Sequence, residues 1–289
     1  MLTDQNLLSI QSLMAAAIAR LEGLGVDEAR TKVELLLSSV TGLSRAHLYA
    51  QYNRIVSPSE VEKFTVLLDR CARHEPVQYI LGTIGFMGLE FLVNEHVLIP
   101  RPETEMLVER VIELAPAFSQ GCTILDIGTG SGNIAISIAR FVSGSKITAI
   151  DVSAQALEIA KRNAQRLGAH AIDFQRCDVL IPFLPEMRCD IIVSNPPYIS
   201  LDEFSRLEKQ VVGFEPRVAL TDGNDGLTFI KRILQDACLR LNSPGVLLVE
   251  LAYNQGEKAR QLARDLGYDS IALRKDFQGF DRMIEAHKK

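Results

Sequence analysis

The sequence lacks the features of a membrane protein, a secreted protein and a zinc protein. No apolar run approaches the roughly 18 residues that a membrane span needs. No basic segment precedes an apolar run near the N-terminus, so we expect neither a membrane partner nor a signal peptide. The five cysteines are an odd number, are scattered and form no C-x-x-C pair. We therefore expect reduced thiols, no metal site and a soluble cytoplasmic protein.

The sequence also lacks the basic excess that is typical of proteins that sheathe nucleic acid. Its net charge is −5 at pH 7 and its pI is about 5.6, so we expect no direct nucleic-acid partner. Apolar residues make up 47% of the chain and charged residues 23%, which is the balance of a globular protein with a full core. The 289 residues allow two domains, or one large domain with an appendage.

The first quarter of the chain has the pattern of a small helical bundle. Apolar residues recur near helical spacing between residues 7 and 40, and Ser57-Pro58-Ser59-Glu60 resembles a helix N-cap with proline close behind. Eight Lys and Arg stand against nine Asp and Glu in residues 1–75, which excludes an electrostatic arm for nucleic acid. The sequence therefore predicts a helical domain over 1–75 that has no chemistry of its own.

The pattern changes at residue 76. Residues 76–100, PVQYILGTIGFMGLEFLVNEHVLIP, are rich in β-branched and aromatic residues and are punctuated by glycines. This composition predicts one β-hairpin that links two domains. The following RPETEMLVERVIELA has acidic residues in the first turn of a predicted helix, and we expect a second domain over 101–289.

Strands and helices alternate from residue 121 onward. The runs CTILDIG, KITAID, IDFQRCD, CDIIVSN and GVLLVELA predict five strands, separated by helical patterns such as SAQALEIAKRNAQRLG. This alternation predicts an α/β fold with a doubly wound, mostly parallel sheet and helices on both faces. The closing runs YDSIALRKD and FDRMIEAHK have no helix between them, which predicts two more strands, the last one antiparallel at an edge of a seven-stranded sheet.

The segment LDIGTGSGNIAISIA has the order strand, glycine-rich turn and helix. Gly128, Thr129, Gly130, Ser131 and Gly132 form this turn, in which the glycines let the backbone approach a ligand closely. Ligands in such folds bind at the carboxyl ends of the strands, where the turn falls. The G-x-G-x-G spacing differs from the dinucleotide pattern, and no Lys follows it, which excludes a P-loop.

Three acids stand at successive strand ends. Asp126 precedes the glycine turn, Asp151 ends the next strand about twenty residues on, and Asp178 ends the third. Asp126 suits a cationic ligand, because Coulomb attraction is strong in a partly buried cleft, and Asp151 can accept hydrogen bonds from ribose hydroxyls. A ligand with a ribose, a hydrogen-bonding base and a positive charge is expected, and S-adenosylmethionine meets these requirements.

The motif SNPPY follows the fourth predicted strand, on the same edge of the sheet. Pro196 and Pro197 fix φ, so the Asn195 side chain and the Pro196 carbonyl are expected to be two preorganised acceptors for one planar –NH₂ group. The ring of Tyr198 is expected to stack on the group that carries this amine. Asn195, Pro196 and Tyr198 are therefore the candidate catalytic residues, and Asn195 is also expected to contact the cofactor.

Residues Asn195–Tyr198 would together form a clamp for a conjugated amine. The chemistry of such an amine explains why a clamp is needed. The nitrogen of an amide or aromatic amine is neutral before methylation and gains positive charge during it. Oriented acceptors favour that charge more in the transition state than in the ground state. Holding the nitrogen in line with the methyl group accelerates methyl transfer further, because the reacting atoms are already close together and aligned.

Several segments resemble known methyltransferases. DIGTGSG and NPPY resemble class I enzymes that act on planar amines, and residues 76–105 with FEPRVALTDGNDGL resemble the HemK-type protein glutamine methyltransferases over nearly the whole chain. The resemblance implies a Rossmann-like fold and methyl transfer from S-adenosylmethionine to the glutamine of the Gly-Gly-Gln loop in class-1 peptide chain release factors. We expect a monomer whose helical domain docks this protein substrate.

The resemblance also implies roles for individual residues. It implies cofactor contacts for Gly128–Gly132, Asp151, Asp178 and Val179, and it implies that Asn195–Tyr198 hold the glutamine amide. Phe86 and the segment Arg101-Pro102-Glu103-Thr104 are implied to line the site.

Three other functions stay open at this point. A glutamine methyltransferase that acts on a ribosomal protein would share the clamp and the cofactor turn. An adenine-specific DNA methyltransferase would need to flip a base and grip phosphates, which the near-neutral N-terminal region does not favour. A non-catalytic cofactor-binding module would need a broken clamp or turn, and both motifs are intact.

Overall fold

The computed structural model describes residues 8–118, 121–178 and 187–288, and the chain divides into two compact units. Residues 1–82 and 208–214 belong to the first unit, and residues 83–207 and 215–289 belong to the second. Within the described ranges, no helix is long and apolar enough to cross a membrane.

The first unit is helical, as predicted. Its helices are α1 (Ile10–Gly23), α2 (Ala29–Thr41), α3 (Arg45–Ala50), α4 (Pro58–Cys71), α5 (Val77–Leu81) and α10 (Lys209–Phe214). The apolar faces of α1 to α5 meet in one core, in which Leu21, Leu36 and Phe64 are fully buried. The predicted N-cap is confirmed, because Ser57 and Glu60 form a reciprocal capping box at the start of α4.

The hairpin predicted over 76–100 is shorter than expected. Residues Val77–Leu81 form helix α5 rather than a strand, and the hairpin consists of β1 (Thr83–Phe86) paired antiparallel with β2 (Leu89–Leu92). Pro76 lies at the N-cap of α5, where its fixed φ suits a helix start. Val77 and Ile80 bury in the core of the first unit, so packing decides the conformation of this short apolar run.

The second unit contains a seven-stranded sheet among the residues described. Its strands are β3 (Thr123–Ile127), β4 (Lys146–Asp151), β5 (Ile172–Arg176), β6 (Cys189–Ser194), β7 (Leu241–Glu250), β8 (Ser270–Lys275) and β9 (Asp281–Lys288). Their order is β5-β4-β3-β6-β7-β9-β8, with β3 to β7 parallel. The antiparallel last strand is confirmed, but β9 lies between β7 and β8, so β8 is the edge strand.

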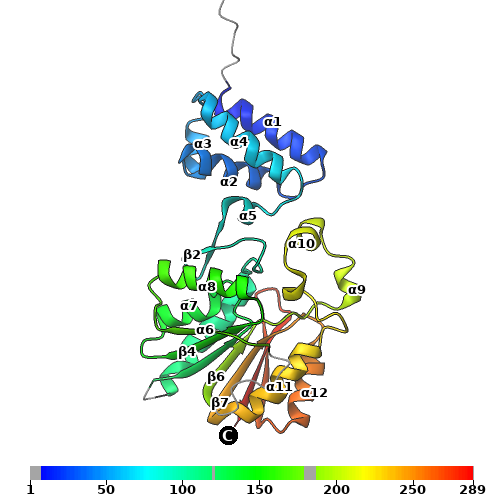
Figure 1. Ribbon diagram of the computed structural model, residues 1–289. Helices are drawn as coiled ribbons and strands as arrows, with labels where there is room; N and C mark the ends of the chain where they lie inside the picture. Colours follow the sequence, from blue (N-terminus) through cyan, green and yellow to red (C-terminus); the bar gives the residue numbers. More distant parts are fainter. Residues whose placement is uncertain (1–7, 119–120, 179–186, 289) are drawn as a thin grey trace, which may run out of the picture. The chain divides into compact units, whose positions relative to one another are not determined.

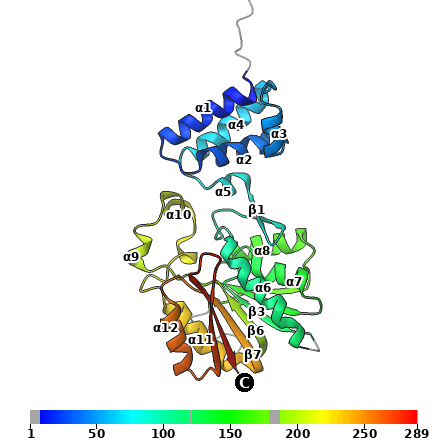
Figure 2. The same cartoon turned by 180° about the vertical axis from the view of Figure 1, so that it is seen from behind.

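Helices cover both faces of this sheet (Figures 1 and 2). The second unit's helices are α6 (Glu105–Leu114), α7 (Asn133–Phe141), α8 (Ala154–Arg166), α9 (Leu201–Phe204), α11 (Thr228–Arg240) and α12 (Gly256–Asp265), with short 3-10 turns η1 (Pro102–Thr104), η2 (Ala115–Ala117) and η3 (Arg217–Ala219). Ile124 and Ile191 pack in one core with α6, α7 and α8, whereas their neighbours Leu125 and Ile192 pack in another with α11 and α12. The predicted doubly wound α/β fold is confirmed, because alternate strand residues serve opposite faces.

Candidate active site

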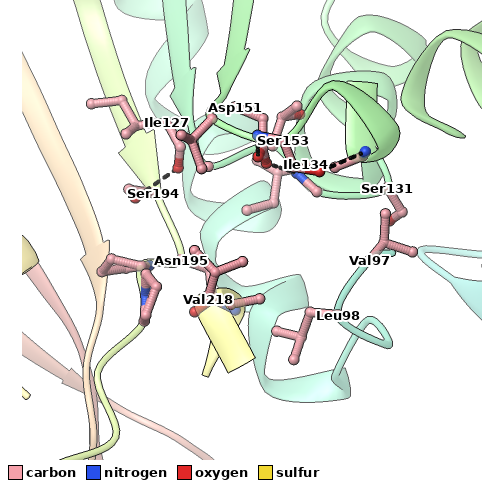
Figure 3. Close-up of a pocket in the computed structure, with 18 of the residues that line it drawn as sticks. Val97, Leu98, Ile127, Ser131, Ile134, Asp151, Ser153, Ser194, Asn195 and Val218 are labelled. Atoms are coloured by element: carbon pink, nitrogen blue, oxygen red, sulfur yellow. Dashed lines mark hydrogen bonds between the residues drawn. The ribbon is translucent and has the colours of Figure 1, made fainter. Parts of the chain in front are cut away.

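A cavity of about 310 Å³ lies at the carboxyl edge of the sheet. Its lining comes from the glycine turn after β3, the end of β4, the NPP segment after β6, and parts of the segments 96–104 and 216–219. Figure 3 shows Asp151, Ser131 and Asn195 around this cavity, together with the apolar side chains of Leu98 and Val218. The cavity therefore combines a few polar groups with an apolar wall, which is typical of a site for a small ligand.

The glycine turn forms one wall of the cavity through its backbone. Gly128, Thr129, Gly130 and Ser131 line it, and the positive φ values of Gly128 (73°) and Gly130 (55°) require glycine. Gly132 does not line the cavity. A Cβ on Gly132 would lie 2.7 Å from the Ile136 side chain, so this glycine permits tight packing at the start of α7.

Asp151 lines the cavity at the end of β4, as predicted from its position. Its Oδ2 accepts a hydrogen bond from the Gly130 amide (2.9 Å) and its Oδ1 accepts one from the Ser153 amide (2.9 Å). Burial raises the pKa of Asp151, and these backbone bonds offset part of the rise. Each carboxylate oxygen keeps a lone pair, so Asp151 can still accept hydrogen bonds from a ligand.

Asp126 does not line the cavity, contrary to the prediction that it faces the crevice. It is fully buried behind the glycine turn, where its Oδ2 accepts from the Thr129 hydroxyl (2.7 Å) and the Ala135 amide (3.3 Å). Burial raises the pKa of Asp126 to about 7. Its Oδ1 has no hydrogen-bond partner among the residues described. Thr129 and Ala135 hold the Asp126 carboxylate behind the glycine turn, where it supports the conformation of the turn.

Asp178 lines the cavity just beyond the end of β5, so the acids of β4 and β5 do meet at one edge. Val179, which the resemblance places beside the cofactor, lies outside the described residues. All five cysteines of the chain are free thiols, and Cys177 lines the cavity next to Asp178.

The NPPY segment lies directly against the glycine turn. The Ser194 hydroxyl donates to the Ile127 carbonyl (2.8 Å), which joins the ends of β6 and β3, and a Cβ on Gly128 would lie 4.0 Å from the Asn195 carbonyl oxygen. Asn195, Pro196 and Pro197 all line the cavity. The structure therefore brings together the two motifs that the sequence singles out.

The side chain of Asn195 has a fixed orientation. Its Nδ2 donates to the Thr104 hydroxyl oxygen (3.0 Å), and Thr104 is 2% exposed. This bond directs the amide nitrogen toward η1 and leaves Oδ1 as the acceptor of the amide group. Thr104 is implied by the family resemblance to line the site, which it does, but its bond to Asn195 was not predicted.

Tyr198 is placed differently from the prediction. It does not line the cavity, and its ring packs against the core on the α11 and α12 side of the sheet. Its hydroxyl donates to Glu250 Oε1 (3.1 Å), and its carbonyl accepts from Gln255 Nε2 (2.9 Å). In this structure Tyr198 anchors the clamp from behind rather than offering a stacking surface.

An ion pair between Arg101 and Glu215 joins two segments of the lining. Glu215 is 6% exposed, and its second oxygen accepts from the Ile99 amide (3.2 Å). Phe86, in contrast, is 2% exposed and meets Phe91 edge-on within the core, so it does not line the cavity. Arg101 and Thr104 therefore line the cavity, as the resemblance implies, whereas Phe86, Pro102 and Glu103 do not.

Comparisons with known proteins agree with this architecture. The family model of the PrmC N-terminal domain matches residues 12–82, and that of a methyltransferase domain matches residues 118–272. The release factor glutamine methyltransferases of Geobacter sulfurreducens and Bacillus subtilis are each 39% identical, with 90% and 87% of this chain and 90% and 88% of those proteins covered. The chain belongs to the release factor glutamine methyltransferase family.

This chain is also similar in fold to solved structures. A methyltransferase from Pyrococcus furiosus is 22% identical, with a TM-score of 0.51 over 71% of this chain and 91% of that one. As a member of the release factor glutamine methyltransferase family, the protein is a methyltransferase that uses S-adenosylmethionine. The cavity fits that group, because it offers an acidic side chain in Asp151, glycine backbone that can be approached closely, and an apolar wall.

Proposed function

We propose that this protein methylates the side-chain amide nitrogen of the glutamine in the Gly-Gly-Gln loop of class-1 translation release factors. The observation that supports it best is the position of Asn195, whose Oδ1 is left as an acceptor at a cavity next to the glycine turn. The names of the relatives that cover most of this chain agree with that substrate.

The residues of the clamp act on the amide nitrogen by position and polarity. Asn195 Oδ1 and the Pro196 carbonyl accept the two N–H groups of the substrate amide, which fixes the plane of the amide. S-adenosylmethionine supplies an electrophilic methyl group when it is bound. As the methyl carbon bonds to the amide nitrogen and its bond to the donor sulfur breaks, positive charge would grow on the nitrogen, and the two acceptors would stabilise it. The methylated nitrogen then loses one proton to solvent, so no strong base is required beforehand.

Asp151 and the glycine turn hold the other part of the proposed complex. Asp151 accepts hydrogen bonds from ribose hydroxyls while Gly130 and Ser153 keep its carboxylate oriented. Asp178 offers a second acceptor at the neighbouring strand end. The apolar wall lowers the polarity around the reacting atoms, which strengthens the interactions of the clamp.

Radiolabelled S-adenosylmethionine tests this proposal with four acceptors: a class-1 release factor, its Gln→Ala loop variant, a preparation of ribosomal proteins and duplex DNA. Label on the intact factor alone is the expected result. Label on the ribosomal proteins alone would assign the enzyme to that substrate, and label on DNA would mean that the clamp binds adenine. Label on the Gln→Ala variant would show that another residue is the acceptor.

We also propose that the helical unit docks the protein substrate, because a loop glutamine alone offers little binding area. Leu24 and Val66 are exposed apolar residues of that unit. Replacing both with Glu is expected to raise KM for the full-length factor without changing kcat or cofactor affinity. Leu239→Glu, an exposed apolar position on α11, is the matched control. An unchanged KM in the double variant would contradict docking by these residues.

A further inference from the structure

We propose that Tyr253, Phe277 and Phe280 form an aromatic docking surface for the folded body of the protein substrate. This inference rests on the proposed function and deepens it, because it gives the release factor a contact on the second unit beside the cavity. Tyr253 and Phe280 are 60% and 48% exposed, and Phe277 is fully exposed. Aromatic side chains are enriched in protein interfaces, and a cluster of them on a surface marks an interaction site.

Two segments of the chain contribute to this aromatic surface. Tyr253 follows β7, whereas Phe277 and Phe280 belong to the turn that joins β8 to β9. The rings of Tyr253 and Phe280 meet edge-on, with their centroids 5.9 Å apart. The surface is therefore made by contact between segments that are distant in the sequence, and it is not a single exposed side chain.

Hydrogen bonds close the turn between β8 and β9. Asp276 Oδ1 accepts from the amides of Gln278 and Phe280 (3.0 Å each), and the Asp276 amide donates to the Phe280 carbonyl (2.9 Å). Asp276 Oδ2 accepts from Arg282 Nη2 (2.9 Å). A turn that is tied in this way presents the Phe277 ring to a partner without a large loss of backbone freedom on binding.

The sheet topology places the aromatic surface at the edge that holds the cavity. Both β7 and β8 are antiparallel to β9, so β8 runs in the same direction as β7. The turn between β8 and β9 and the residues after β7 therefore lie at the carboxyl edge of the sheet. A folded protein that delivers a glutamine to the cavity comes to this same edge.

The aromatic surface is also joined to the NPPY segment. Gln255, two residues after Tyr253, donates through Nε2 to the Tyr198 carbonyl (2.9 Å). A second, polar hollow of about 570 Å³ is lined by parts of the segments 200–203, 223–227 and 254–258. The surface therefore begins directly beside the segment that carries the clamp.

The protein substrate accounts for this surface better than a second copy of the chain does. A copy seated permanently beside the clamp segment would cover the edge at which the glutamine enters. Three exposed side chains are also few for a stable dimer, in which each partner buries about 800 Å². A few aromatic anchors instead suit a partner that binds, reacts and leaves.

The test measures methyl transfer from radiolabelled S-adenosylmethionine to a full-length class-1 release factor. Phe277→Ala is expected to raise KM for the factor about tenfold, which is the effect of losing one interface anchor. The kcat value and the cofactor affinity should not change, because Phe277 does not line the cavity. Phe277→Tyr keeps an aromatic ring and should restore KM.

Phe141→Ala is the matched control. Phe141 is 48% exposed, as Phe280 is, but it lies at the end of α7. This helix leads from the carboxyl end of β3 to the start of β4, so Phe141 lies toward the opposite edge of the sheet. Its replacement should leave KM for the factor at the wild-type value, and equal effects of Phe141→Ala and Phe277→Ala would contradict the proposed surface.

Binding without turnover gives an independent readout. Calorimetry with the Gln→Ala loop variant of the factor should give a dissociation constant about tenfold higher for Phe277→Ala than for the wild type. A wild-type enzyme that fails to label the intact factor would overturn the proposed function. A wild type that labels it, with KM and the dissociation constant unchanged in Phe277→Ala, would overturn the docking surface alone. A wild-type dimer that becomes monomeric in Phe277→Ala, measured by light scattering, would overturn it in favour of a second copy.

Discussion

Glu250 and Glu285 lie in the neighbouring strands β7 and β9 and are equally buried, each 2% exposed. Burial raises the pKa of both carboxyls. At Glu285, hydrogen bonds from Arg110, Arg274 and His287 outweigh burial, and the pKa falls to about 2. At Glu250, burial outweighs the hydrogen bond from the Tyr198 hydroxyl and the effects of the nearby Thr104 and Arg282, and the pKa is raised to about 7.

The difference separates a buried acid that is fully paired from one that is only partly paired. The Arg110 guanidinium binds both oxygens of Glu285 (2.7 and 2.8 Å), so this charge is permanently paired and ties α6 to the sheet. Glu250 accepts a hydrogen bond from the Tyr198 hydroxyl through Oε1, and its Oε2 has no hydrogen-bond partner among the residues described. An incompletely compensated buried acid is unfavourable for stability, and such groups cluster at functional sites.

The largest expected effect comes from removing the bidentate partner of Glu285. Arg110→Met should lower the free energy of unfolding by about 4 kcal/mol, because it leaves a buried carboxylate without its bidentate partner. Urea denaturation at pH 7 measures this change, and methyl transfer per folded molecule should stay at the wild-type level. Glu113→Gln removes only an exposed partner of Arg110 and should change stability by less than about 1 kcal/mol. Equal effects of the two variants would contradict the account.

A second prediction concerns the pH dependence of stability. The pKa of Glu250 is raised in the folded state from 4.5 to about 7, so its contribution to stability is full below about pH 4.5 and is lost as pH rises through 7. Glu285 has the opposite sign, and its contribution is lost as pH falls from about 4.5 toward 2. Between pH 5 and 8 the wild type should lose about 3 kcal/mol more than Glu250→Gln.

Denaturant titrations of the two proteins at several pH values measure this difference. Asp126 has a pKa raised to about 7 as well, but it is present in both proteins and cancels from the comparison. Parallel stability curves for the wild type and Glu250→Gln would mean that Glu250 is already ionised, or already neutral, over the whole range.

Tyr198→Phe should have the smallest of the three effects. The substitution removes the hydroxyl that donates to Glu250 Oε1. Above pH 7, where Glu250 is ionised, this should lower the free energy of unfolding by about 2 kcal/mol. The loss of this donor should also raise the pKa of Glu250 further, so the stability that depends on neutral Glu250 should be lost at a higher pH than in the wild type. A loss that occurs at a lower pH would show that the hydroxyl destabilises the ionised form.

Much of the site can be predicted from the sequence because a parallel sheet places all its carboxyl strand ends at one edge. Asp151, Asp178 and Asn195 each follow a recognisable strand, and each lines the cavity. Local patterns are equally informative where the interaction itself is local. The capping box joins Ser57 and Glu60, which are three positions apart, and it is visible in the sequence.

The remaining features depend on contacts that no local pattern reveals. Asp126 turns away from the cavity because Thr129 and Ala135 supply donors behind it. Helix α5 replaces part of the predicted hairpin because five residues are too few for periodicity to decide, and burial decides instead. Thr104 and Asn195 are far apart in the sequence and come into contact only in the folded chain. The direction of their hydrogen bond therefore cannot be predicted from either motif.

The most direct test of the central claim compares cofactor binding with methyl transfer in Asn195→Ala. Asn53→Ala, an exposed position in the first unit, is the matched control. The account predicts that calorimetry finds S-adenosylmethionine affinity nearly unchanged, while transfer to the release factor falls about 100-fold or more. Equal losses of binding and transfer would make Asn195 chiefly a cofactor ligand and would contradict its role as the acceptor that holds the glutamine amide.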